Sequence, residues 1–371
     1  MQIAVPKEIK NHEYRVALTP TGTRELVNRG HTVTVQAGAG EGAGFADAAF
    51  EAAGARLETD VTKVWDSAEL ILKVKEPQPD EVARLEAGQT LFTYLHLAAE
   101  ESLTRGLMAS GATCIAYETI TDRQGGLPLL APMSTVAGRM AIQAGAHSLE
   151  KAQGGAGVLL PGVPGVAPAK VAVIGGGVVG ENAARMALGL GAEVTVLDTS
   201  IPRLETLDDR YQGRMKTVFS TADAIDEAVR ECDLIVGAVL IPGAAAPKLI
   251  TRAMLAEMKP GSVLVDVAID QGGCFETSRA TTHADPTYLV DGIVHYCVAN
   301  MPGGVARTST QALTNATMPF VTALADKGWQ QALGDDAHFA AGLNVHAGQV
   351  TYAAVAEAFG LEYVAPDKLL D

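Results

Sequence analysis

The sequence is poor in cysteine and in basic residues, and each shortage excludes a class of protein. The four cysteines form no C-x-x-C pair. This pattern argues against a disulfide framework and predicts reduced thiols in a reducing compartment, which we take to be cytoplasmic. Lysine and arginine number 28 against 43 aspartate and glutamate residues, and the formal charge is −15. An excess of acid disfavours nucleic acid and anionic membranes as partners.

Long hydrophobic runs and common metal or nucleophile patterns are also missing. The charge-poor region 154–169 is broken by Pro161, Pro164 and Pro168, so we expect no membrane-spanning helix there. The opening residues "MQIAVPKEIK" predict a charged strand rather than a signal peptide. The eight histidines show no H-E-x-x-H spacing and G-x-S-x-G is absent, so neither a metal site nor a serine nucleophile is predicted.

Strand and helix patterns alternate in two separate series along the 371 residues. The predicted strands are 2–8, 31–36, 70–75, 90–96 and 113–118 in the first series and 170–175, 193–198, 216–220, 233–240, 262–269 and 295–300 in the second. The second set is almost continuously Val, Ile, Leu and Ala, which indicates strands buried on both faces by helices. The sequence therefore predicts an α/β protein with two doubly wound, Rossmann-like parallel sheets and a cleft between them.

The remaining segments predict how the chain divides. Residues 134–153 have helical spacing and could link the domains, while 308–333 and 343–359 predict long helices with no further strands after residue 300. We expect these last helices to pack on the first domain. The predicted domains are 1–130 with 308–371, and 131–307.

A glycine motif in the second series predicts a dinucleotide site. Gly175, Gly177 and Gly180 form G-x-G-x-x-G between an apolar strand and an Ala-rich helix. The glycines allow a tight turn, close approach of the backbone to a pyrophosphate, and close packing of helix on strand. Asp198 ends the next strand, where a carboxylate can bind both ribose hydroxyls. It would repel a 2′-phosphate, which favours NAD over NADP, although Arg203 lies close enough in sequence to complicate that preference.

Ligands of doubly wound sheets bind outside the carboxyl ends of the strands, and Asp270 stands at one such end. It follows "VLVDVAI" directly. The carboxylate could simply turn the chain before Gly272, or it could face the nicotinamide.

The same rule applied to the first sheet assembles a set of cations. Arg15 follows its first strand, Lys75 its third and His96 its fourth. Arg15 can hold a carboxylate with two hydrogen bonds, Lys75 can polarise a carbonyl, and an imidazole can pass a proton near neutral pH. The set suits a 2-keto, 2-amino or 2-hydroxy acid. A buried core histidine is the alternative for His96, and Glu118 after the fifth strand is expected to be structural or to orient a cation.

Several longer segments resemble one enzyme family. "VPKEIKNHEYRVALTP" is similar to the N-terminal signature of L-alanine dehydrogenases and of the nucleotide-binding subunit of proton-pumping transhydrogenases. "YLHLAAE", "APMSTVAGRMA", "VLLPGVPGVAPAKVAVIGGGVVGENAA" and "NMPGGVARTSTQALTNATMPF" resemble alanine dehydrogenases in particular, in order and over essentially the whole chain.

The resemblance implies reversible, NAD-dependent oxidative deamination of L-alanine to pyruvate and ammonia by a homohexamer. It implies that Arg15 and Lys75 bind substrate and that His96 and Asp270 are the catalytic pair. Beside the glycines, it implies cofactor contacts at Ser134, Val178, Asp198, Arg203, Ser220, Val239, Leu240, Val267, Ala268, Ile269, Asp270, Arg279, Val298, Ala299, Asn300 and Met301. Ala156, Pro161 and Ala306 depart from the family pattern, in segments between the domains.

Three other functions remain open from the residues. A transhydrogenase-like subunit would bind nucleotide but would need partner domains. A 2-hydroxyacid dehydrogenase would use the same carboxylate clamp but would need no water addition. A non-catalytic NAD-sensing oligomer would bind the cofactor without turnover.

Overall fold

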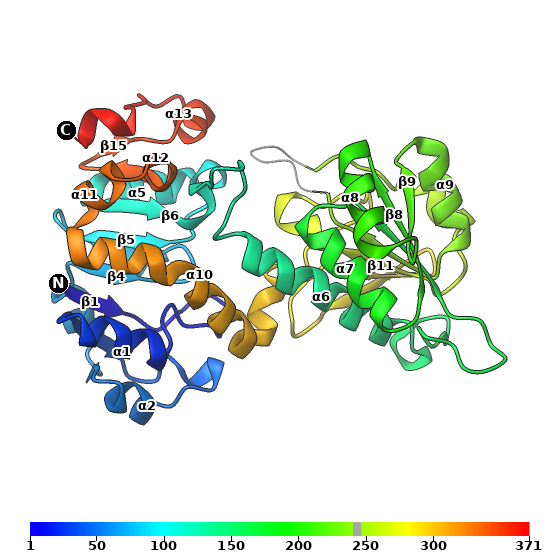
Figure 1. Ribbon diagram of the computed structural model, residues 1–371, viewed down its shortest axis with the longest axis horizontal. Coiled ribbons are helices and arrows are strands. Elements are labelled where there is room, and N and C mark those ends of the chain that lie inside the picture. The colour runs from blue at the N-terminus through cyan, green and yellow to red at the C-terminus, as the bar shows by residue number, and fades with distance from the viewer. Residues whose placement is uncertain (240–245, 371) are drawn as a thin grey trace. The chain divides into compact units, whose positions relative to one another are not determined.

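The computed structural model describes residues 1–239 and 246–370, which form two compact units (Figure 1). Unit 1 comprises Met1–Met133 and Gly303–Asp371, and unit 2 comprises Ser134–Pro302. The predicted cofactor contact Leu240 lies outside the described residues.

Unit 1 is built on an eight-stranded sheet in the order β15-β14-β6-β5-β4-β1-β2-β3. The strands that pair in parallel are β1 (Gln2–Val5), β2 (Thr32–Gln36), β3 (Arg56–Glu58), β4 (Leu70–Leu72), β5 (Thr90–Thr93) and β6 (Thr113–Ala116). At one edge, β14 (Leu343–His346) pairs antiparallel with β6 and with β15 (Gln349–Val350).

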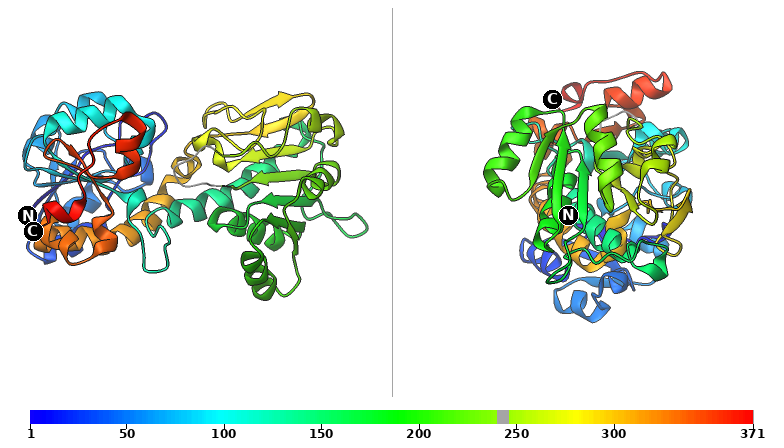
Figure 2. Two further views of the ribbon diagram at one scale, coloured as in Figure 1. Left: turned by 90° about the horizontal axis from the view of Figure 1, so that it is seen from above. Right: turned by 90° about the vertical axis from the view of Figure 1, so that its right-hand side faces the viewer.

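Helices cover both faces of this sheet. Figure 2 shows α5 and α10 on opposite sides of it. One apolar cluster joins the sheet to α3, α5 and α13 through side chains such as Trp65, Leu107 and Val355. The helices of this unit are α1 (Pro20–Asn28), α2 (Asp47–Ala52), α3 (Val61–Asp66), α4 (Pro79–Val82), α5 (Glu101–Ser110), α10 (Ala306–Lys327), α11 (Trp329–Gly334), α12 (Ala337–Ala340) and α13 (Ala353–Phe359).

Unit 2 contains a seven-stranded sheet in the order β12-β13-β11-β10-β7-β8-β9. Its strands are β7 (Lys170–Ile174), β8 (Glu193–Asp198), β9 (Lys216–Phe219), β10 (Leu234–Gly237), β11 (Val263–Asp266), β12 (Thr287–Val290) and β13 (Ile293–Tyr296), and β12 alone of these described strands runs antiparallel. Its helices are α6 (Ala131–Ser148), which begins in unit 1, α7 (Val178–Gly189), α8 (Ile201–Tyr211) and α9 (Ala222–Glu231). Ala183 and Ile142 on α7 and α6 pack in one apolar cluster, whereas Val229 on α9 packs in another.

Both sheets reverse their strand order at one point, which locates the candidate sites. In unit 1 the chain leaves β1 for β2 and later returns to the other side of β1 with β4. In unit 2 the same reversal separates β7 from β10. Ligands of such sheets bind outside the carboxyl ends of the strands at this reversal. The prediction of two doubly wound sheets is confirmed.

Several predicted elements are wrong in detail. Residues 343–359 form β14, β15 and α13 rather than one helix, because Ala347 and Gly348 turn the chain at φ 47° and 82° and β14 then covers the edge of β6. The segment 308–333 is two helices separated by Gly328. The short strands β3 and β12 were not predicted, and most predicted strands end one to four residues early, which leaves polar side chains in the following loops.

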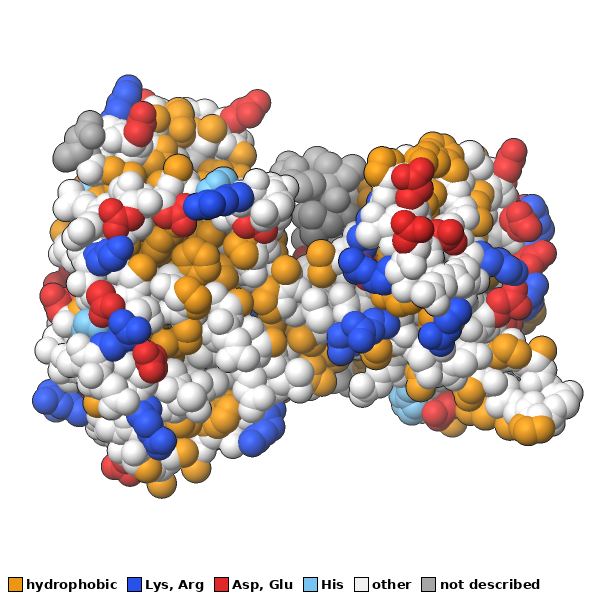
Figure 3. Space-filling view, in the orientation of Figure 1, with side chains coloured by type: hydrophobic (Ala, Val, Ile, Leu, Met, Phe, Trp, Pro, Cys, Tyr) orange, Lys and Arg blue, Asp and Glu red, His pale blue; other side chains and the backbone are white. Residues whose placement is uncertain are grey.

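The described residues form neither a membrane-spanning helix nor a metal-binding cluster. Within residues 1–239 and 246–370, no helix is long and apolar enough to cross a membrane. The same residues contain no group of three or more His, Cys, Asp or Glu side chains arranged to hold a metal ion. Figure 3 shows acidic and basic side chains interspersed on the visible face of both units.

Candidate functional site

The glycine motif of unit 2 forms a turn that leaves no room for a side chain at Gly175 or Gly180. Gly175 has φ 100°, and a Cβ there would lie 2.7 Å from the carbonyl oxygen of Ala238 at the end of β10. A Cβ on Gly180 would lie 1.7 Å from the carbonyl oxygen of Gly175. Helix α7 begins directly after Gly177, so its free backbone N–H groups face the turn. The glycine turn and the start of α7 therefore fit a pyrophosphate, and they lie where the sheet reverses its strand order.

Asp198 braces this turn from the end of β8. Its carboxylate accepts hydrogen bonds from the backbone N–H of Gly176 at 2.6 Å and of Ser200 at 2.8 Å. Arg203, in the first turn of α8, donates from Nε to the carbonyl oxygen of Gly176 at 2.5 Å. The acid and the arginine thus bind the two backbone polar groups of one residue of the glycine turn, Gly176.

The other predicted cofactor residues of unit 2 mostly follow the carboxyl ends of its parallel strands. Val178 follows β7, Ser220 follows β9 and Val239 follows β10; Val267, Ala268, Ile269 and Asp270 follow β11; Val298, Ala299, Asn300 and Met301 follow β13. Val298 is fully buried. Ser134 and Arg279 are exceptions. Ser134 lies in α6, and the Arg279 guanidinium lies over the Tyr288 ring at 3.9 Å.

The segment that carries Asp270 is fastened by a carboxylate that the sequence reasoning missed. Asp266 is fully buried at the end of β11. It accepts from the backbone N–H of Ala268 at 3.0 Å and of Cys274 at 2.8 Å, and from the hydroxyl of Ser278 at 2.5 Å. Because these donors stand before and after Asp270, Asp266 closes the loop that presents it. The signal was an aspartate inside the apolar run "VLVDVAI".

In unit 1, Arg15 is already paired with a carboxylate. Its Nε donates to Glu13 Oε1 at 2.7 Å and its Nη2 to Glu13 Oε2 at 2.5 Å, and the arginine is 2% exposed. Its Nη1 points to the sulfur of Met133 at 3.0 Å. Burial opposes the charge of Arg15, but Glu13 outweighs it and raises the pKa of the guanidinium. Glu13 thus orients the Arg15 guanidinium.

A second buried cation, Lys73, lies two residues before Lys75, and the sequence reasoning did not single it out. Lys73 is fully buried and donates to Glu8 at 3.0 Å and to Glu81 at 2.8 Å. Burial lowers its pKa, but the two carboxylates outweigh this effect and raise it. Glu8 also accepts from the backbone N–H of Val74 at 2.7 Å, so the cluster fixes the chain just before Lys75. The signal was the alternation of lysines with apolar residues in "LILKVKEP".

His96 is not a buried core residue. Its side chain is 46% exposed, and its backbone is left-handed at φ 51° where a short 3-10 helix begins. Glu118 accepts from the backbone N–H of Leu95 and of His96, and its Oε1 lies 3.8 Å from His96 Nδ1. The ring also stacks on Tyr94 with centroids 5.8 Å apart. A positive φ at a non-glycine residue costs free energy and persists only where the surroundings impose it. The hydrogen bonds from Leu95 and His96 to Glu118 hold the backbone in this conformation, and the stacking on Tyr94 positions the ring.

The structure brings the predicted unit 1 residues to one edge of the sheet. Strands β1, β4 and β5 are neighbours, and Arg15, Lys75 and His96 follow their carboxyl ends. The hydroxyl of Thr93 on β5 donates to the carbonyl oxygen of Lys75 at 3.0 Å, which ties two of these loops together. Unlike Arg15 and Lys73, Lys75 makes no salt bridge with any described residue.

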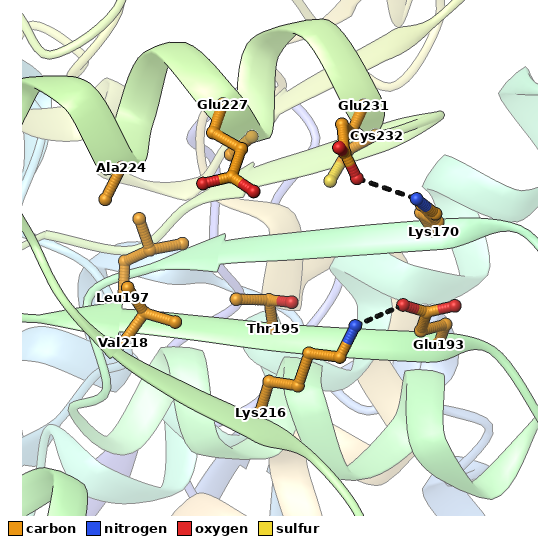
Figure 4. A pocket seen from close by; sticks show the side chains of 11 residues that line it. Lys170, Glu193, Thr195, Leu197, Lys216, Val218, Ala224, Glu227, Glu231 and Cys232 are labelled. Carbon is orange, nitrogen blue, oxygen red and sulfur yellow. Dashed lines mark hydrogen bonds and ion pairs between the residues drawn. The ribbon is translucent and has the colours of Figure 1, made fainter.

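A hollow in unit 2 lies away from these groups. It has a volume of about 120 Å³ and is lined by Lys170, Glu193 and Lys216, the first residues of β7, β8 and β9 (Figure 4). It therefore borders the amino ends of the strands, opposite the glycine turn. Lys170 pairs with Glu231 and Lys216 with Glu193, so the cations of this hollow are already compensated.

Comparison with known proteins places these features in a family. The N-terminal domain model of the Alanine dehydrogenase/PNT family matches residues 4–137, and the C-terminal domain model matches residues 141–353. The chain belongs to this family. The resemblance deduced from the sequence is thereby confirmed.

Relatives in the family match the chain from end to end. A curated alanine dehydrogenase from Halomonas elongata is 85% identical over 370 residues, covering 100% of both chains. One from Bacillus subtilis is 56% identical and covers 100% of this chain and 98% of its own. A solved L-alanine dehydrogenase superposes with a TM-score of 0.94 at 51% identity, covering 97% of this chain and 99% of its own. A transhydrogenase structure from Sinorhizobium meliloti has a TM-score of 0.82 at 27% identity, covering 95% and 100%.

Proposed function

We propose that the protein interconverts L-alanine and pyruvate by NAD-dependent oxidative deamination, with ammonia as the second product. The observation that carries this proposal is the 85% identity to an alanine dehydrogenase over the whole chain. The transhydrogenase reading is less well supported because that structure is only 27% identical.

Unit 1 provides the substrate-binding side chains in this proposal. Arg15, whose guanidinium Glu13 orients, binds the substrate carboxylate. Lys75 makes no salt bridge with the described residues, and its ammonium stabilises negative charge that develops on the substrate oxygen.

Unit 2 provides the cofactor site. The glycine turn and the start of α7 hold the pyrophosphate, and Asp198 binds the adenine ribose. When bound, NAD supplies the hydride acceptor for oxidation of alanine and the donor for reduction of the imine.

His96 and Asp270 carry out the proton transfers. Oxidation leaves an imine that must add water, and the resulting carbinolamine must pass a proton to nitrogen before ammonia leaves. His96 is exposed and held by Glu118 and Tyr94, which suits a group that exchanges protons. Asp270 orients the attacking water from the loop that Asp266 closes.

The assembly and the compartment are part of the same proposal. We expect a homohexamer, and three apolar side chains of the segment 154–169 support burial between copies: Leu159, Val163 and Val166 are 61%, 51% and 63% exposed. A cytoplasmic location is supported by the four cysteines, all free and buried. Light scattering after size exclusion tests the assembly.

The function is tested by oxidation of NADH with pyruvate, with and without ammonium. Turnover that requires ammonium, and that falls by about 10²–10⁴-fold in His96→Ala, is expected from general acid–base catalysis. Turnover without ammonium would instead identify a 2-hydroxyacid dehydrogenase. Binding of NADH without any turnover would favour the transhydrogenase-like subunit or the NAD sensor.

A further inference from the structure

Four charged side chains lie close together where β8 meets the glycine turn. They are Glu181, Asp198, Arg203 and Arg210. Glu181, in the first turn of α7, is 14% exposed at its side chain. One carboxylate oxygen pairs with Arg203 Nη2. The other pairs with Arg210 Nη1 and accepts from the Tyr211 hydroxyl at 3.1 Å. Burial raises the pKa of Glu181, but the two guanidinium groups outweigh it and hold the pKa below its ordinary value, so the carboxylate is ionised at neutral pH.

This cluster leaves Arg203 committed to the protein. Its Nε donates to the Gly176 carbonyl oxygen at 2.5 Å and its Nη2 to Glu181. The neighbouring Asp198 carboxylate is held by the N–H of the same Gly176. The two negative charges of Glu181 and Asp198 therefore equal the two positive charges of Arg203 and Arg210. Of the four, Asp198 is the one that borders the predicted ribose site.

The position of Arg203 makes this pairing significant for the cofactor. In dinucleotide-binding folds, an acid at the end of the second strand binds the ribose hydroxyls, and an arginine nearby accommodates a 2′-phosphate when NADP is used. Arg203 stands five residues after Asp198, at the start of the helix that follows this strand. Its Nε and Nη2 would be available to a phosphate only if the contacts with Gly176 and Glu181 were released.

We propose that Glu181 is a specificity-determining residue that favours NAD over NADP by withholding Arg203 from a 2′-phosphate. The inference rests on the proposed use of NAD and adds the residue that enforces it. Asp198 repels the phosphate directly, whereas Glu181 removes the cation that would compensate for this repulsion. Glu181 acts through Arg203 and is a positioning residue.

The test measures binding in the absence of substrate. Dissociation constants of NADH and NADPH, and of 5′-AMP and adenosine 2′,5′-bisphosphate, are determined by calorimetry for the full chain and for Glu181→Gln. We expect the preference for the unphosphorylated member of each pair to fall about tenfold in Glu181→Gln, or about 1.4 kcal/mol, because a freed guanidinium gains a charge-assisted hydrogen bond to phosphate. Adding Arg203→Ala to this variant should abolish the gain.

Two further variants separate the proposal from a purely structural role. Glu193→Gln breaks an ion pair with Lys216 at the amino ends of the strands and should leave both preferences unchanged. Arg203→Ala alone should also leave the preference within about twofold, and it tests the proposal even if Glu181→Gln does not fold.

The outcomes are distinct. An unchanged preference in Glu181→Gln, a gain that persists without Arg203, or a large change in Arg203→Ala alone would overturn the inference while leaving NAD use intact. Failure of the unaltered protein to bind NADH would overturn both the inference and the proposed function.

Discussion

Replacing Asp266 by asparagine tests whether the loop that presents Asp270 must be fastened for turnover. The carboxylate is fully buried and accepts three hydrogen bonds of 3.0 Å or less, two of them from the backbone on either side of Asp270. An asparagine has one acceptor oxygen. If that oxygen keeps the hydrogen bonds from Cys274 and Ser278, the NH₂ group of the asparagine faces the backbone N–H of Ala268. Two donors then face each other, and the hydrogen bond from Ala268 is lost.

The cost follows from these contacts. One hydrogen bond to a charged group contributes about 1.5–3 kcal/mol, and a buried donor left without an acceptor costs about 1–3 kcal/mol, so Asp266→Asn should destabilise unit 2 by about 2.5–6 kcal/mol. A shift of about 1 Å in a catalytic group can cost on the order of 100-fold in rate. We therefore expect kcat for pyruvate amination to fall by about 10- to 100-fold at a temperature where the variant is folded.

The assay pairs kcat with the thermal midpoint of unfolding. Asp233→Asn is the matched control, since Asp233 accepts from the backbone N–H of Lys170 at 2.8 Å at the amino end of the same sheet. It should lower the midpoint but leave kcat unchanged. Ser278→Ala, which removes one donor and keeps the charge of Asp266, should have an intermediate effect. If folded Asp266→Asn turned over within twofold of the control, Asp266 would have no part in placing Asp270.

Three further predictions concern the buried charges and the glycine turn. Lys73→Met should lower the free energy of unfolding by about 3–5 kcal/mol, because it leaves the carboxylate of Glu8 buried and unpaired, and denaturant unfolding should show a partial recovery when Glu8→Gln is added. Gly180→Ala should abolish NADH binding by calorimetry, since its Cβ would lie 1.7 Å from the oxygen of Gly175; normal affinity would contradict the packing described here. Burial holds the pKa of His295 below its ordinary value of 6.5. The contribution of His295 to stability is therefore present above pH 6.5 and is lost as the pH falls through its pKa in the folded protein. The thermal midpoint of His295→Gln should depend less on pH than that of the unaltered protein between about pH 7 and 5.

Some predictions from the sequence succeeded because their cause is local. Gly175, Gly177 and Gly180 lie within six residues, and the turn they form requires a positive φ at Gly175 and no Cβ at Gly180. The central strands of unit 2, β7, β10 and β11, were predicted because burial on both faces selects an uninterrupted apolar run. The placement of Arg15, Lys75 and His96 at one edge followed from a general rule of doubly wound sheets.

Other features could not be predicted, because partners far apart in the sequence decide them. The segment 343–359 has apolar spacing that suits a helix, yet β14 pairs with β6 because the edge of the folded sheet offers free backbone groups there. Strand ends were also misjudged, since side chains such as Lys73 look like part of a strand until their buried partners are known.

The sequence by itself therefore determined the family, the two doubly wound sheets, the nucleotide turn and the residues proposed for the chemistry. Each of these depends on patterns within a few residues or on repeats of such patterns. Only the tertiary structure decided which groups bind the charged side chains. Glu8 pairs with Lys73 across 65 residues, Glu181 pairs with Arg203, and backbone N–H groups on either side of Asp270 bind Asp266. The physical reason is that a buried charge is stable only beside its compensating group, and the order of strands in the sheet fixes which group that is.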